Sequence, residues 1–125
     1  MQNKKKSKDW EEQRKYRRRH LIYYLEVLDA LDDSVFGRLI DITIGGIMVV
    51  SKDLKQKDKI YHLRVVLPKR IKGKKQLFLD ARCAWCQEDS NTDSFAAGFE
   101  LQNVEEKIKE IIKLLIDEFS FEDND

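Results

Sequence analysis

The spacing of apolar residues changes once along this chain of 125 residues, and that change limits the fold class. Between residues 21 and 101 the spacing follows a period of two within short stretches, which is typical of half-buried β-strands. From Val104 to Phe119 apolar residues recur every three or four positions, as on one face of an amphipathic helix. The sequence therefore predicts an all-β domain with a C-terminal helix.

Six strands are expected, at residues 21–27, 35–42, 47–50, 61–67, 77–85 and 95–101. Gly45 and Gly46 separate the second strand from the third, and Pro68 should end the fourth because proline cannot donate to a ladder. Six short strands favour a closed antiparallel barrel, since closure removes exposed edges. The predicted organisation is a basic N-terminal arm over residues 1–20, a barrel over 21–102, a helix over 103–120 with Asn103 as its N-cap, and an acidic tail over 121–125.

The fifth strand carries a Cys-x-x-Cys sequence, "CAWC", at residues 83–86. Alternation places Cys83 and Trp85 on the inner face and Cys86 on the outer face. Cysteines on opposite faces of one strand cannot form a disulfide, so a redox role is not expected. By the same alternation, Trp85 is expected in the core rather than as a surface for base stacking.

Sequence features that accompany catalysis or membrane insertion are missing from the chain. His20 and His62 have no cysteine or acidic residue at metal-ligand spacing, and no nucleophile motif, Walker loop or dinucleotide fingerprint occurs. No apolar stretch is long enough to cross a bilayer, and the N-terminus lacks the apolar segment of a signal peptide. We therefore expect a cytoplasmic, non-enzymatic protein without a metal or cofactor.

Charge is distributed unevenly although the formal net charge is only +1. Basic residues concentrate in the first 20 positions, and the last residues are acidic. A basic arm on a near-neutral body suggests an anionic partner, such as nucleic acid, acidic lipid headgroups or a phosphate-bearing small molecule. For the lysines of residues 4–8 a solvated tail is the favoured interpretation, because basic tails are common and unspecific.

Two short motifs make the anionic partner more specific. "RKYRR" at residues 14–18 contains Arg14-x-x-x-Arg18, and "DITIGG" contains Asp41-x-Thr43-x-x-Gly46. In this order, ahead of and within a six-stranded barrel with a C-terminal helix, the motifs resemble those of the PilZ domain, a bacterial family best known as a receptor for cyclic di-GMP. The resemblance implies a six-stranded antiparallel split β-barrel, with Thr43 in place of the usual serine.

The resemblance also implies roles for the motif residues. The guanidinium groups of Arg14 and Arg18 would contact phosphate oxygens or guanine edges. The carboxylate of Asp41 would accept from guanine N1–H and N2–H, and the Thr43 hydroxyl would donate to a phosphate oxygen. The glycines would supply a backbone conformation that other residues resist and let the ligand approach. The expected ligand-binding residues are Arg14, Arg18, Asp41, Thr43, Gly45 and Gly46, with Arg17, Arg19 and Gly98 as accessory candidates.

The sequence thus favours a non-catalytic cyclic di-GMP receptor. Ligand binding would order the arm across the barrel, and the changed surface would meet a downstream protein that the sequence does not identify. One alternative is a degenerate PilZ domain that acts only in protein–protein interaction. A second, less favoured alternative is a basic-armed barrel that binds nucleic acid, because the strands show no obvious exposed aromatic ladder for base stacking.

Overall fold

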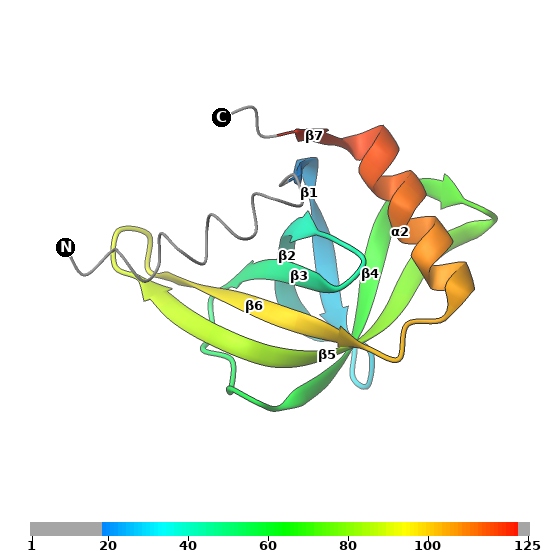
Figure 1. The fold of residues 1–125 in the computed structure, drawn as a ribbon. Helices are drawn as coiled ribbons and strands as arrows, with labels where there is room; N and C mark the ends of the chain where they lie inside the picture. The colour runs from blue at the N-terminus through cyan, green and yellow to red at the C-terminus, as the bar shows by residue number, and fades with distance from the viewer. Residues whose placement is uncertain (1–18, 123–125) are drawn as a thin grey trace.

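The structure, a computed structural model, describes residues 19–122 (Figure 1). Its elements in chain order are β1 (Arg19–Asp29), β2 (Val35–Ile42), β3 (Gly46–Ser51), β4 (Ile60–Ile71), β5 (Lys74–Asp89), β6 (Ser94–Gln102), α2 (Glu106–Phe119) and β7 (Ser120–Glu122). All strand pairs are antiparallel.

Strands β1 to β6 close into a barrel. The order β2-β3-β6-β5-β4-β1 is completed by an additional ladder between β1 and β2. The predicted closed six-stranded antiparallel barrel with a C-terminal helix is therefore confirmed. Closure matters because it leaves the facing edges of β1 and β2 paired rather than open to other chains.

Strand β1 forms ladders along both of its edges. Residues 27–29 pair with β4, residues 19–21 pair with β7 on the same edge, and β2 occupies the other edge. The short strand β7 was not predicted from the sequence. Its residues fall where the end of the helix and the start of the acidic tail were expected, and they form a strand because the backbone of β1 is available to pair with them.

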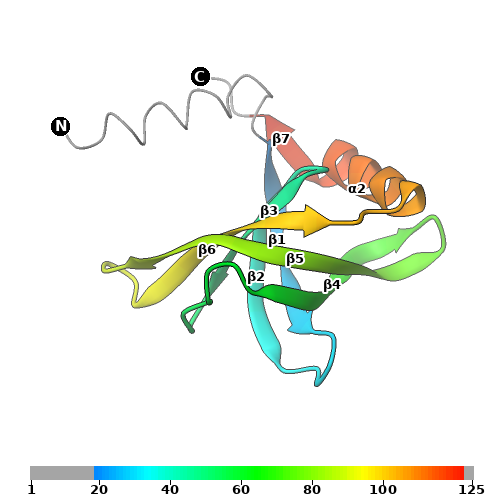
Figure 2. The same cartoon turned by 60° about the horizontal axis from the view of Figure 1, so that its bottom comes forward.

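The barrel interior is filled by alternate residues of the strands. The buried cluster also takes in three helix residues, Ile111, Ile112 and Leu115, so barrel and helix share one core. The helix lies beside the hairpin of β4 and β5, as two views agree (Figures 1 and 2). Two ion pairs join helix and hairpin, Lys69 to Glu118 at 2.5 Å and Lys72 to Glu110 at 3.3 Å.

The predicted N-cap of the helix and the predicted end of the fourth strand were wrong. Helix α2 has Glu105 as its N-cap rather than Asn103, whose backbone instead has a φ of 50° in the connection from β6. Pro68 does not end the fourth strand, which continues to Ile71. The ladder to β5 is interrupted between Val66 and Ile71, so the proline lies where no ladder hydrogen bond is required of it.

In residues 19–122 no helix is both long and apolar enough to cross a bilayer.

A bulge in β5 overturns two predictions about side-chain direction. Cys83 pairs with Phe99, but Trp85 rather than Ala84 pairs with Gly98, so β5 holds one extra residue at this point. The extra residue turns Trp85 outward, where it is 39% exposed, and brings Cys86 against the core. Both cysteines are free. Burial raises the pKa of the Cys83 thiol, which keeps it protonated and unreactive.

The shared core predicts unequal effects of two neighbouring leucines in α2. Leu115 is fully buried, whereas Leu114 is 41% exposed. Leu115→Ala should lower the free energy of unfolding by about 2–5 kcal/mol, because it removes core contacts and leaves a cavity. Leu114→Ala, the matched control, should change it by less than about 1 kcal/mol. Urea denaturation followed by circular dichroism measures both, and equal effects would mean that the helix does not pack into the barrel core.

Candidate functional site

The described part of the candidate site lies where β2 turns into β3. Asp41 is in β2, Thr43 and Gly45 are in the connection, and Gly46 begins β3. The arginine-bearing motif falls outside the described residues, so Arg14, Arg17 and Arg18 stay predictions. The structure thus brings the second motif together as a single turn, and it fixes where the arm joins the barrel.

The hydroxyl of Thr43 organises this turn. Its oxygen accepts from the backbone N–H of Gly45 at 3.2 Å and of Gly46 at 3.1 Å. The same hydroxyl donates to the carbonyl of Gly46 at 3.3 Å, and the backbone N–H of Thr43 donates to that carbonyl at 2.8 Å. A threonine or serine is therefore needed here to satisfy turn donors, whether or not its hydroxyl also touches a ligand.

The two adjacent glycines have different reasons to be present. A Cβ on Gly46 would lie 2.8 Å from the backbone carbonyl oxygen of Phe99, because β3 runs close to β6 at this point. A Cβ on Gly45 would meet nothing within 4 Å. Neither glycine has a φ in the left-handed region, so the expectation that they supply a special backbone conformation was wrong. Only Gly46 is sterically required, and the requirement is close strand packing.

A β-bulge in β2 places the Asp41 side chain on the outer face of the sheet. Leu39 pairs with Val49 on β3, but Asp41 pairs with Met48, so Ile40 is the extra residue. Leu39 is buried and faces the core, and simple alternation would have placed Asp41 on that same inner face. The extra residue gives Asp41 the outer face that Met48 occupies on β3, where the residue is half-buried and its Oδ1 is covered.

The arm enters the barrel beside Asp41. Asp41 pairs with His20 across the β1–β2 ladder, and the backbone of Arg19 pairs with Glu122 of β7. The ladder therefore brings the start of β1, which follows directly on the Arg14-x-x-x-Arg18 motif in the sequence, beside the strand that carries Asp41.

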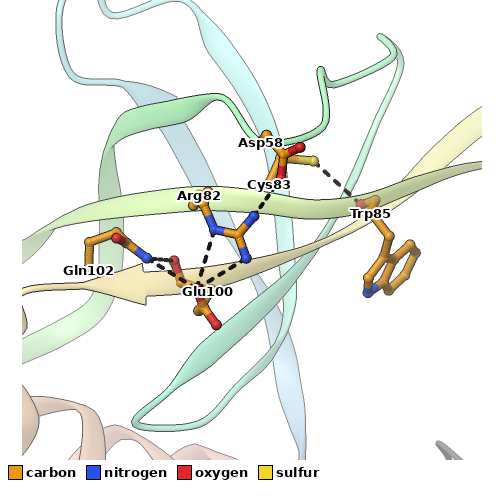
Figure 3. Close-up of polar contacts among 6 residues, drawn as sticks. All are labelled: Asp58, Arg82, Cys83, Trp85, Glu100 and Gln102. Carbon is orange, nitrogen blue, oxygen red and sulfur yellow. Dashed lines mark hydrogen bonds and ion pairs between the residues drawn. The ribbon is translucent and has the colours of Figure 1, made fainter.

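A charge network occupies the same outer surface, one row further along the sheet (Figure 3). Gly46 pairs with Glu100, which pairs with Arg82. The guanidinium of Arg82 contacts Glu100 Oε1 at 3.2 and 3.3 Å and Asp58 Oδ1 at 2.7 Å. Both carboxylates compensate the charge of Arg82. An anionic ligand would therefore have to be attracted by other cations.

Polar contacts elsewhere on the surface do not form a metal site. His62 Nδ1 lies 2.7 Å from Asp80 Oδ1, and both side chains are about half exposed. In the part of the chain that the structure describes, no group of three or more His, Cys, Asp or Glu side chains is placed to hold a metal ion.

Comparison with known proteins identifies the family. The profile of the PilZ domain matches residues 12–118, which is most of the chain and includes both motifs. The chain belongs to the PilZ domain family. No curated protein has a sequence that matches this one significantly.

Two solved PilZ structures share the fold. The chain is similar to the inhibitor of motility MotI/DgrA from Bacillus subtilis, with 17% identity and a TM-score of 0.64, over 81% of this chain and 48% of that one. It is similar to the PilZ domain of YcgR from Escherichia coli, solved with c-di-GMP, with 17% identity and a TM-score of 0.62, over 82% of this chain and 88% of that one. The chain therefore spans about half the length of MotI/DgrA and most of the YcgR domain.

The unequal surroundings of the two glycines predict unequal effects of alanine. Gly46→Ala should lower the free energy of unfolding by about 1–3 kcal/mol, because the new Cβ would collide with a backbone oxygen that cannot move without disturbing β6. Gly45→Ala, the matched control, should change it by less than about 0.5 kcal/mol. Thermal and urea denaturation measure both. An equally tolerated alanine at both positions would show that β3 and β6 are further apart than the structure has them.

Proposed function

We propose that this PilZ domain is a receptor for cyclic di-GMP. The observation that carries the proposal is the pairing of His20 with Asp41, which joins the arginine arm to the barrel next to an outward-facing carboxylate. The c-di-GMP bound to the YcgR domain, whose fold is similar, supports the same ligand class for this chain.

Each part of the site would recognise a different part of the nucleotide. The guanidinium groups of Arg14 and Arg18 would pair with phosphate oxygens or with the O6 and N7 edge of guanine. The Asp41 carboxylate would accept from guanine N1–H and N2–H, an edge that adenine does not present. Because Arg82 is occupied by Glu100 and Asp58, the arm would supply the cations that neutralise the phosphates.

We further propose that the ligand fixes the arm against the barrel and that the resulting surface signals to a partner protein. Arm and turn come from different parts of the chain, so a ligand that contacts both would hold them together. Addition of cyclic di-GMP should therefore slow trypsin cleavage within residues 1–18, where the arm offers many basic cleavage sites. Equal cleavage rates with saturating ligand and without it would contradict this ordering.

The arm arginines should contribute most of the affinity. Arg14→Ala and Arg18→Ala should each weaken cyclic di-GMP binding by about 2 kcal/mol or more, roughly 30-fold, as expected for charge-assisted contacts. Lys5→Ala is the matched control within the same basic arm and should have little effect. Isothermal titration calorimetry measures the affinities, and thermal unfolding without ligand should hardly change in any of the three variants.

Selectivity tests the assigned role of Asp41 separately. The wild-type protein should bind cyclic di-GMP in preference to cyclic di-AMP and GTP, and Asp41→Ala should lower both the affinity and the preference for guanine. A basic tail would lose a similar small amount at every lysine or arginine, with salt removing the differences. Equal losses at Lys5 and Arg18 would therefore count against a defined site. No binding by the intact protein at micromolar ligand would favour a protein-interaction domain that has lost nucleotide binding.

A further inference from the structure

Besides the arm, the chain has a second concentration of positive charge, in the hairpin of β4 and β5. Of the eight residues from Pro68 to Lys75 five are basic and none is acidic, although the formal net charge of the chain is only +1. The end of the hairpin lies at the edge of the molecule, next to α2 (Figures 1 and 2). The basic residues of the hairpin are Lys69, Arg70, Lys72, Lys74 and Lys75.

The hairpin ends in a narrow two-residue turn. Ile71 pairs with Lys74, and the two residues between them form the turn. Both have a left-handed φ, 51° for Lys72 and 79° for Gly73, as a type I′ turn requires. The guanidinium of Arg70 donates to the carbonyl of Gly73 at 3.3 Å. The end of the hairpin is therefore only two paired strands wide, and the turn geometry and this hydrogen bond hold its shape.

Two of the five cations hold the hairpin against α2. Lys69 contacts Glu118, and Lys72 contacts Glu110 two helical turns earlier. The four side chains are about half exposed, so these ion pairs position the hairpin but add little to the stability of the fold. The two carboxylates compensate two lysines, which leaves three cations of the hairpin to attract an external anion.

The three remaining cations, Arg70, Lys74 and Lys75, are exposed. None of them forms an ion pair with an acidic side chain of residues 19–122. Lys74 and Lys75 are consecutive residues of β5, so their side chains point to opposite faces of the hairpin. Arg70 has further N–H donors besides the one that it uses in the turn. The end of the hairpin thus presents positive charge on two faces.

We propose that the end of this hairpin binds double-stranded DNA by entering the major groove, where its cations contact phosphates of both strands. The major groove is about 12 Å wide and admits a two-stranded β-ribbon. Phosphates border the groove on both sides, so a ribbon with cations on two faces is complementary to it. Contacts to phosphate carry no sequence information, so binding is independent of sequence. The inference goes beyond the proposed function, because it involves neither motif and does not require cyclic di-GMP.

The shape of the hairpin favours duplex DNA over other polyanions. A flat membrane would meet the cations of one face only, and Ile71, the apolar residue beside the turn, is buried and not placed to insert. The major groove of an RNA duplex is deep and too narrow for protein groups to read. The lack of an exposed aromatic ladder counts against single strands, whose bases stack on aromatic rings, and has no bearing on a duplex.

Fluorescence polarisation with a labelled duplex of about 20 base pairs measures the affinity and its dependence on salt. Lys74→Ala/Lys75→Ala should weaken binding about tenfold at low salt and reduce the slope of log affinity against log salt by about 2, because two phosphate contacts are lost. Lys52→Ala/Lys57→Ala is the matched control, since these exposed lysines lie in the connection between β3 and β4 and removing them changes the charge equally. Equal losses in both proteins, or no binding by wild type at low salt, would overturn the inference.

Competition identifies the groove. Methyl green, which occupies the major groove, should displace the protein from the duplex, whereas netropsin, which occupies the minor groove, should not. Displacement by netropsin alone would overturn the major-groove geometry. A membrane is tested with vesicles that contain phosphatidylserine, to which wild type should bind no better than Lys74→Ala/Lys75→Ala. Hairpin-dependent binding to these vesicles without binding to the duplex would assign the surface to a membrane and overturn the inference.

Calorimetry with cyclic di-GMP separates this inference from the proposed function. The hairpin is built from β4 and β5, whereas the motif turn joins β2 to β3, and β6 lies between β3 and β5 in the sheet. Lys74→Ala/Lys75→Ala should therefore bind cyclic di-GMP as wild type does while its affinity for the duplex falls. A loss of duplex binding that is accompanied by an equal loss of cyclic di-GMP binding would mean that the lysines act through the fold, and would overturn the inference.

Discussion

The close antiparallel pairing of β3 with β6 is the constraint on which the candidate site depends. Here Gly46 faces Glu100 and Gly98 faces Met48, with no room for a Cβ on either glycine. At Gly46 the obstacle is a backbone oxygen of β6, and at Gly98 it is a side chain of β5. Because a backbone oxygen lies against Gly46, the turn from Asp41 to Gly46 keeps a fixed position next to β6.

Local sequence was enough to predict strands β1 to β6, helix α2 and the turn between β2 and β3. The second strand was predicted at its observed bounds because turn residues flank it on both sides, and the helical stripe in α2 predicted the buried residues Ile111, Ile112 and Leu115. The turn from Asp41 to Gly46 could also be predicted from the sequence, because its hydrogen bonds join residues at most three positions apart. The arm motif, which lies outside the described residues, remains a prediction.

What the sequence could not predict depends on pairing between distant strands. A bulge inserts one residue and thereby reverses the side-chain direction of all that follow it in the strand. The misplacement of Trp85 and Cys86 therefore has a single cause at Ala84. The sequence signal for this bulge was indirect. Ala84 and Trp85 on β5 lie opposite Gly98 on β6, but this combination indicates a bulge only when β5 and β6 are known to pair.

The arm and the barrel differ in what they would contribute to the candidate site: the arm carries basic residues, and the barrel face carries groups held in place by hydrogen bonds. On the barrel face near Gly46 the guanidinium of Arg82 is held by Glu100 and Asp58, one positive charge against two negative ones, so this cluster does not attract phosphate. Rigid polar groups can distinguish one base from another, because an unpaired donor or acceptor on the wrong base is costly to bury. The basic residues are instead concentrated in the arm, where their cost to barrel stability is small and their attraction for phosphate acts over a longer range. In the proposed receptor the arm would therefore supply most of the affinity for the phosphates, and the barrel would supply the selectivity for guanine.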